Sequence, residues 1–143
     1  MKFKIITIGK PKLFFAKEGF MEYVKRLRGS HSVDVVHLRD GVSDEKILGE
    51  LNCEFSIALD ENGKEFSSRE LSEFLDKKSL EGIGKVCFII GGPDGHSDKI
   101  KENVDFVWSF GKMTLPHDLA MVVLIEALYR ATTISAGHPY HRE

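Results

Sequence analysis

A run of apolar residues over Lys85–Ile90 (KVCFII) constrains the fold of this chain more than any other feature. A strand that buries only one face alternates apolar and polar residues. A strand that is apolar throughout, as here after its first residue, is typical of a parallel sheet covered on both faces. The run therefore predicts an α/β fold, an open and mostly parallel sheet with helices on both faces.

Strand and helix patterns alternate along the whole chain in the order β-α-β-α-β-α-β-α-β-α. The 143 residues contain no linker or internal repeat, so a single domain spanning 1–143 is expected. Residues 60–63 (DENG) are expected to form a turn that ends the third strand. Strands are expected over residues 3–8, 32–38, 55–59, 85–90 and 105–110. Helices are expected over 15–27, over a short stretch after Ser43, after the capping box of Ser67 and Glu70, and over 116–136. A further helix, whose bounds the pattern does not assign, is expected between residues 90 and 105.

Composition indicates in which compartment the protein works and whether it has a membrane partner. Cys53 and Cys87 are the two cysteines, which excludes a disulfide-built scaffold and fits a reducing compartment. The longest uninterrupted apolar run, residues 119–125, has seven residues, whereas a membrane span needs about 20. Lys4 and Lys10 interrupt the apolar residues near the N-terminus, so no signal peptide is expected. We therefore expect a soluble cytoplasmic protein with no membrane partner.

The net charge of −2 conceals an uneven distribution. Residues 1–30 carry eight lysines and arginines against two glutamates, a net of +6, whereas residues 31–110 carry a net of −8. A basic segment at one end of an acidic chain can attract a polyanion. It can equally be the solvated face of a helix, and charge alone does not separate the two interpretations.

The loops at the carboxyl ends of the strands are the places to look for a ligand, because open α/β sheets bind ligands at that edge. They follow Leu59, Ile90 and Phe110. Residues 91–95 (GGPDG) form neither a dinucleotide fingerprint nor a phosphate loop. They predict either a tight β-α turn or a close approach of backbone to a ligand. Residues 111–116 (GKMTLP) are mostly uncharged and could line an adenine pocket or merely connect two elements.

The expected last helix and the tail after it are both unusual. Residues 119–128 contain a single charge, so the helix must be buried on most sides. It faces either the sheet and a second protomer, or the centre of one core. The tail of residues 138–143 (HPYHRE) combines two imidazoles, a phenol and a guanidinium. A metal site there is disfavoured for want of a third ligand at suitable spacing, which leaves a catalytic or substrate-binding tail or a disordered polar end.

Three segments together resemble a known family. They are residues 59–64 (LDENGK), residues 90–95 (IGGPDG), and a C-terminal part comprising residues 115–117 (LPH), residues 126–131 (EALYRA) and the HPYHRE tail. In this order they are similar to the ribosomal RNA large subunit methyltransferase H family, the pseudouridine N3-methyltransferases of the SPOUT class. The resemblance covers essentially the full length.

The resemblance implies an S-adenosylmethionine-dependent enzyme. It implies a C-terminal trefoil knot, a homodimer with each site near the protomer interface, and methylation of a pseudouridine at N3 in large-subunit ribosomal RNA within the assembled ribosome, with no DNA partner. It places the cofactor contacts on Leu59, Gly92, Gly111, Lys112, Met113, Thr114, Leu115 and Pro116. It places the RNA or target-base contacts on Tyr140, His141 and Arg142, with His138 beside them.

Several points stay open at the level of sequence. Many members of the family have an arginine where this chain has Met121, which leaves the role of the last helix toward RNA unsettled. The N3 proton must be lost near attack, and Arg142 could stabilise the anion while His141 or His138 takes the proton. A SPOUT-like enzyme acting on transfer RNA, or a nonenzymatic ribosome-binding factor, are the alternatives.

Overall fold

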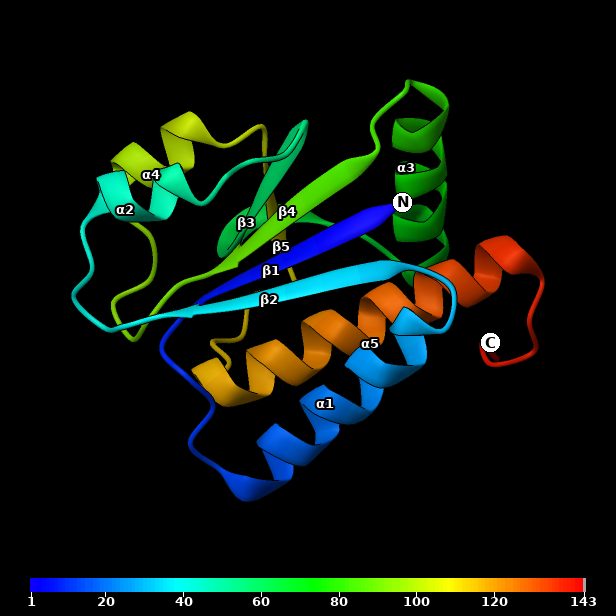
Figure 1. Cartoon of the computed structure of the whole chain (residues 1–143), viewed down its shortest axis with the longest axis horizontal. Helices are drawn as coiled ribbons and strands as arrows, with labels where there is room; N and C mark the ends of the chain where they lie inside the picture. Colours follow the sequence, from blue (N-terminus) through cyan, green and yellow to red (C-terminus); the bar gives the residue numbers. More distant parts are fainter. Residues whose placement is uncertain (143) are drawn as a thin grey trace.

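The computed structural model describes residues 1–142 and contains one five-stranded sheet in the order β2-β1-β4-β3-β5. Every neighbouring pair of strands is parallel, and helices cover both faces (Figure 1). The predicted fold class is thus confirmed. The elements are β1 (Lys2–Ile8), α1 (Phe14–Arg28), β2 (Ser32–Leu38), α2 (Asp44–Gly49), β3 (Phe55–Glu65), α3 (Ser68–Leu80), β4 (Lys85–Ile90), α4 (Asp98–Asn103), β5 (Phe106–Ser109) and α5 (His117–Ala136).

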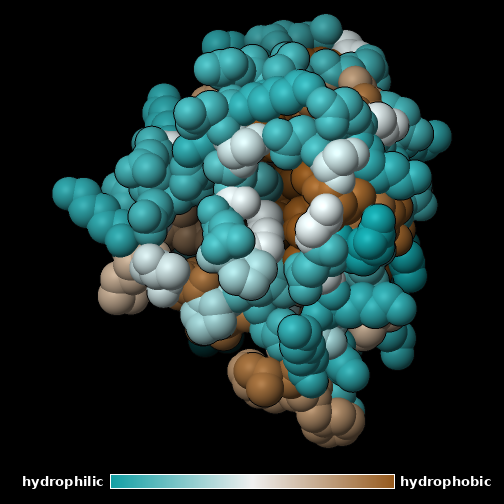
Figure 2. Space-filling view, turned by 90° about the vertical axis from the view of Figure 1, so that its left-hand side faces the viewer, coloured by the Kyte–Doolittle hydropathy of each residue, from teal (hydrophilic) through white to brown (hydrophobic). Residues whose placement is uncertain are grey.

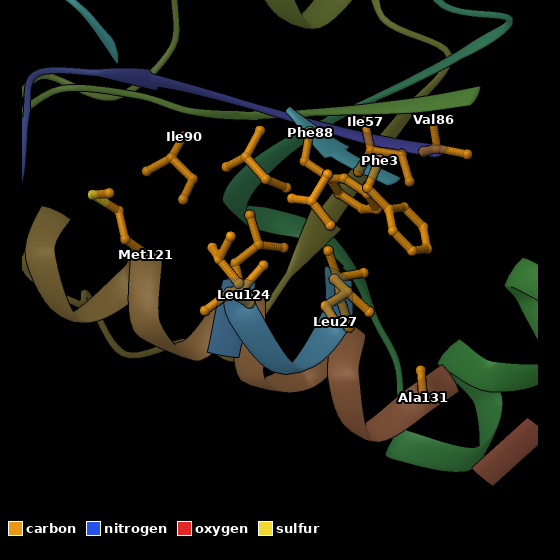
Figure 3. Packing of buried hydrophobic residues seen from close by; sticks show 14 of the residues in the cluster. Phe3, Leu27, Ile57, Val86, Phe88, Ile90, Met121, Leu124 and Ala131 are labelled. Atoms are coloured by element: carbon orange, nitrogen blue, oxygen red, sulfur yellow. The ribbon is translucent and has the colours of Figure 1, made fainter. Parts of the chain in front are cut away.

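Two apolar clusters fill the space between the sheet and its helices. The larger joins the sheet to α1, α3 and α5, and the smaller joins it to α2 and α4. Figure 3 shows Met121 and Leu124 of α5 pointing toward Ile90 and Phe88 of β4. Met121 is fully buried, so this position of α5 faces the core and not the solvent.

The third strand departs from expectation at residues 60–63. β3 continues through this expected turn to Glu65, and both Leu59 and Lys64 pair with Trp108 across a break in register. Gly63 makes this possible, because a Cβ there would lie 2.6 Å from the backbone of Val107. The prediction that residues 60–63 end the strand is therefore wrong. The segment forms an irregularity inside a longer strand, because only glycine fits against the neighbouring backbone.

The structure pairs Cys53, before β3, with Cys87 of β4 in a disulfide. A single bond is not a disulfide scaffold, but it differs from the free cysteines that a reducing compartment implies. The two cysteines meet because both pack in the cluster beneath α2 and α4.

α5 is long and apolar enough to cross a membrane by length and composition alone, a test that the core helix of a soluble protein also passes. It packs beside α1, as Figure 1 shows, and buries Met121, Leu124 and Leu128 against the sheet.

Candidate functional site

A cavity of about 540 Å³ lies at the carboxyl edge of the sheet, where β3, β4 and β5 end. This volume is in the range of small-molecule sites. Figure 2 looks onto this edge and shows apolar residues in a hollow surrounded by polar ones. The walls come from the three loops that the sequence singled out, after Leu59, after Ile90 and after Phe110.

The structure brings together nearly all of the predicted cofactor contacts. Lys112 belongs to the same loop as five of them, but it does not line the cavity. Its side chain is exposed. The predicted residues that do line the cavity are Leu59, Gly92, Gly111, Met113, Thr114, Leu115 and Pro116.

The loop of residues 91–95 is a tight turn. The N–H of Gly95 donates to the carbonyl of Gly92 at 3.0 Å, with Pro93 following the acceptor, the position it favours in a β-turn. Gly95 has φ +73°, which favours glycine. A Cβ on Gly92 would point toward Asp40 and Ile8 at 3.5 Å, an ordinary contact distance. The tight-turn interpretation therefore accounts for the loop, and the missing side chain of Gly92 faces protein.

His96 fixes this loop from behind. Its Nε2 lies 3.2 Å from the carbonyl oxygen of Ile89, to which the neutral imidazole donates in the appropriate tautomer. Burial is the main reason why the pKa of His96 is lowered, although the carbonyl of Ile89 and the charge of Asp60 oppose the shift. An imidazole held neutral as a donor to backbone gives His96 a structural role in this loop.

Carboxylates contribute the polar side of the cavity, although the sequence analysis placed them only in a turn and a motif and not among the site residues. Asp60 and Glu61 line it, and Asp60 pairs with Lys101 at 3.4 Å. Glu61 accepts a hydrogen bond from the hydroxyl of Thr114 at 3.0 Å, which ties the 111–116 loop to the irregular part of β3. The signal was available, since both carboxylates follow Leu59 directly at the end of the expected strand.

His117 lines the cavity at the start of α5, and Asp118 follows it in the chain. The Nε2 atom of His117 is buried and has no hydrogen-bond partner among the described residues. The carboxylate of Asp118 accepts the backbone N–H groups of Lys12 at 2.7 Å and Leu13 at 2.6 Å. Burial opposes ionisation of Asp118, but these N–H donors and the neighbouring His117 together outweigh it and lower its pKa. Asp118 thereby fastens the β1–α1 connection to the cavity wall, a contact that spans more than 100 residues and has no local signal.

The tail folds back on the far end of α5. The hydroxyl of Tyr140 donates to Glu126 at 2.9 Å and lies 3.1 Å from the hydroxyl of Tyr23 on α1. Arg130 lies over the ring of Tyr140, at 4.8 Å from its centroid, and also donates to Nδ1 of His141 at 3.0 Å. Burial, together with the hydrogen bonds to Tyr23 and Glu126, raises the pKa of Tyr140. Tyr140 is therefore a protonated anchor.

The cavity and the tail lie at opposite ends of one helix. His117, the first residue of α5, lines the cavity, whereas the tail begins after Ala136, its last residue. Twenty helical residues span about 30 Å at 1.5 Å per residue. Figure 1 shows the C-terminus at the end of α5 away from the strand ends. The structure thus separates the predicted tail residues His138, Tyr140, His141 and Arg142 from the cavity within one chain, while Glu143 lies outside the described residues.

Within residues 1–142 the structure holds no cluster of three or more His, Cys, Asp or Glu side chains arranged for a metal ion.

Comparison with known proteins gives the family. A profile described as "Predicted SPOUT methyltransferase" matches residues 1–141. The ribosomal RNA large subunit methyltransferase H of Deinococcus radiodurans is 51% identical over 145 residues, which cover 99% of each chain. That of Thermus thermophilus is 37% identical over 142 residues, again covering 99% of each chain.

The chain belongs to the ribosomal RNA large subunit methyltransferase H family of SPOUT methyltransferases. Membership confirms the expected resemblance, the methyltransferase activity and S-adenosylmethionine as the methyl donor. It also sets aside the nonenzymatic binding factor.

Solved structures agree on the fold. A probable methylase family protein from Haemophilus influenzae superposes with a TM-score of 0.61 over 99% of this chain and 70% of that one, at 12% identity. The SpoU methyltransferase AviRb from Streptomyces viridochromogenes, solved with AdoMet, gives a TM-score of 0.50 over 96% of this chain and 61% of that one, also at 12% identity. The trefoil knot stays a prediction.

The residues of the cavity suit this methyl donor. Apolar side chains of Leu59, Trp108 and Leu115 offer a surface for an adenine ring, and the carboxylates of Asp60 and Glu61 can accept from hydroxyl or ammonium groups. When bound, S-adenosylmethionine supplies an activated methyl group. The chain's own contribution is to hold and shield it.

Proposed function

We propose that this protein methylates N3 of a pseudouridine in large-subunit ribosomal RNA, within the assembled ribosome and in the cytoplasm, and that it works as a homodimer. The observation that supports the dimer is that the cavity and the tail lie at opposite ends of α5. If the tail meets the target base, as the family resemblance implies, it must do so at the cavity of a second protomer. The names of the relatives support the RNA substrate.

The exposed part of α5 supports pairing of two chains. The helix is apolar, yet only 33% of its most apolar window is buried within the chain. Leu119 is 37% exposed, and Val122 and Val123 are half-buried. An apolar helix left half-covered needs a partner, and a two-fold axis would set one protomer's tail beside the other's cavity.

The tail residues Tyr140, His141 and Arg142 are the candidates for positioning the target base and for removing its proton. Methyl transfer requires the N3 nitrogen to be held in line with the methyl group and to lose its proton. Tyr140 cannot take this proton, because its raised pKa keeps the phenol protonated and its O–H already donates to Glu126. We assign it to anchoring. Arg142 is exposed and carries the charge that would stabilise the N3 anion. His141 is the candidate for the proton, which its Nδ1 can take only when Arg130 no longer donates to it.

Basic residues accompany the tail. The last turn of α1 carries Lys25, Arg26 and Arg28, and the guanidinium of Arg26 lies 5.1 Å from the ring centroid of Tyr23, the hydroxyl partner of Tyr140. Arg28 is partly engaged in the fold, since it donates to the carbonyl of Val33 at 2.9 Å. These cations are placed to meet phosphates near the tail, which favours recognition of an RNA shape over reading of bases.

The reaction is tested by mass spectrometry of ribosomal RNA from cells that lack and then regain the protein. We expect one pseudouridine in large-subunit RNA to lose and recover a methyl group at N3. A methyl group that disappears from transfer RNA instead would establish the alternative substrate. Purified ribosomes with labelled S-adenosylmethionine give the same answer in vitro.

The shared site is tested by complementation between two inactive variants. One lacks residues 138–143, and the other carries Ala120→Trp, which fills the cavity. Random pairing gives half mixed dimers, each with one intact site of two, so co-expression should restore about a quarter of wild-type activity. Mixing a variant with itself is the control. No recovery in demonstrated mixed dimers would show that the tail acts on its own chain.

A further inference from the structure

A projection of exposed aromatic and apolar side chains stands at the rim of the cavity. It consists of residues 10–17, which we name the 10–17 tip. Leu13 is 51% exposed, Phe14 73% and Phe15 59%. Figure 2 shows hydrophobic atoms projecting at the lower edge of this face, where α1 begins. Adjacent large apolar side chains left in solvent mark an interaction surface.

The same tip is positively charged. Lys10, Lys12 and Lys17 are all exposed, and the sequence has no acidic residue between Gly9 and Lys17. Aromatic rings between lysines are the combination that binds single-stranded nucleic acid, since the lysines meet phosphates and the rings stack on unpaired bases.

The tip is held against the cavity wall. Asp118 accepts the N–H groups of Lys12 and Leu13, and its neighbour His117 lines the cavity. Asp118 is only 8% exposed, so this double hydrogen bond is largely shielded from water. The tip therefore has a fixed position relative to the place where the methyl group is presented.

We propose that the 10–17 tip is an RNA-contact surface, in which Phe14 and Phe15 stack on an unpaired base beside the target nucleotide and Lys10 and Lys12 meet the flanking phosphates. The inference rests on the proposed function, which brings an RNA loop to the adjacent cavity. Unpaired loop bases are the part of an RNA that aromatic side chains recognise.

Charge favours RNA over a second copy of the chain on this surface. A second copy would bring one of its own basic segments, either its tip or the last turn of α1 near its tail, against these lysines. Like charges in an interface are unfavourable. An anionic lipid surface has the right charge, but a membrane has no connection with the cavity against which the tip is held. Both occupants are outcomes of the test.

The experiment compares the double variant Phe14→Ala/Phe15→Ala with the wild type and with Phe14→Tyr/Phe15→Tyr, which keeps both rings. Leu80→Ala removes an apolar side chain that is 89% exposed on α3 and serves as the matched control. Affinity for purified large ribosomal subunits is measured by sedimentation at several salt concentrations. Calorimetry reports S-adenosylmethionine binding, and light scattering reports the oligomeric state.

We expect the alanine variant to bind ribosomal subunits at least tenfold more weakly, while the tyrosine variant and the control stay within about twofold of the wild type. Cofactor affinity and molecular mass should not change. Unchanged affinity for subunits would overturn the proposal, and so would a fall in mass to the monomer, which would make the tip a protomer contact.

Two further outcomes complete the test. Binding of the wild type to vesicles of anionic phospholipid that is lost in the alanine variant, with subunit binding kept, would assign the tip to a membrane. A wild type that binds subunits through the tip but transfers no methyl group would refute the proposed reaction and leave the tip standing. If the wild type does not bind subunits, the proposal that the 10–17 tip contacts RNA is refuted.

Discussion

Replacing Tyr140 by phenylalanine separates an anchoring hydroxyl from a catalytic one. The substitution keeps the ring that packs against Tyr129 with centroids 4.8 Å apart, and removes the O–H that donates to Glu126 at 2.9 Å. A hydrogen bond to a charged acceptor contributes about 1.5–3 kcal/mol net. Because Tyr140 and Glu126 are both partly exposed, we take the lower end, about 1.5 kcal/mol.

That free energy corresponds to a factor of about ten in the ratio of docked to undocked tail. We therefore expect methylation of ribosomes to slow by up to about tenfold, with S-adenosylmethionine affinity unchanged. Tyr23→Phe removes a neutral hydrogen bond at the same place and should slow the reaction less, by about fivefold. Hydrogen exchange of the tail residues should speed up in both variants.

Tyr129→Phe is the matched control, because the hydroxyl of Tyr129 makes no side-chain hydrogen bond among the described residues. Loss of a proton-transferring group costs about 100-fold to 10,000-fold. A fall of that size in Tyr140→Phe, with Tyr23→Phe unaffected, would refute anchoring and make the hydroxyl part of the chemistry. A wild-type rate would show that the hydroxyl does not position the tail.

Three more outcomes follow from the fold and its charges. Gly63→Ala should lower the free energy of unfolding by about 3 kcal/mol and Tm by about 10 °C, because its Cβ would lie 2.6 Å from the neighbouring strand. Gly49→Ala is the control, since a Cβ there meets open space and should leave Tm unchanged. Equal Tm values for the two variants would contradict this prediction. The pKa of His96 is lowered from 6.5 by burial, so the unfolded chain binds the proton more readily and stability to urea should fall between pH 7 and pH 5.5, less so in His96→Gln. Lys25→Glu should weaken ribosome binding and reduce its salt dependence, whereas Lys77→Glu on α3 should change neither. Equal effects of the two substitutions would mean that the basic face of α1 is only solvated and does not bind the ribosome.

Local patterns in the sequence determined the elements of this protein. Lys85–Ile90 and Ser32–Leu38 have the bounds that hydrophobic patterning predicted, and Ser43 and Ser67 cap the helices they were expected to open. These features depend on a residue and its near neighbours, so periodicity and capping chemistry identify them. The carboxyl-edge loops were also foreseeable, because parallel strands bring their ends to one edge.

Only the tertiary structure decided which groups meet across long stretches of chain. The turn expected at residues 60–63 became part of β3, since the backbone of β5 lies against Gly63. Asp118 reaches back to Lys12, and the length of α5 sets the tail far from the cavity of its own chain. Such contacts arise from the packing of elements and not from neighbouring residues, so no local pattern encodes them.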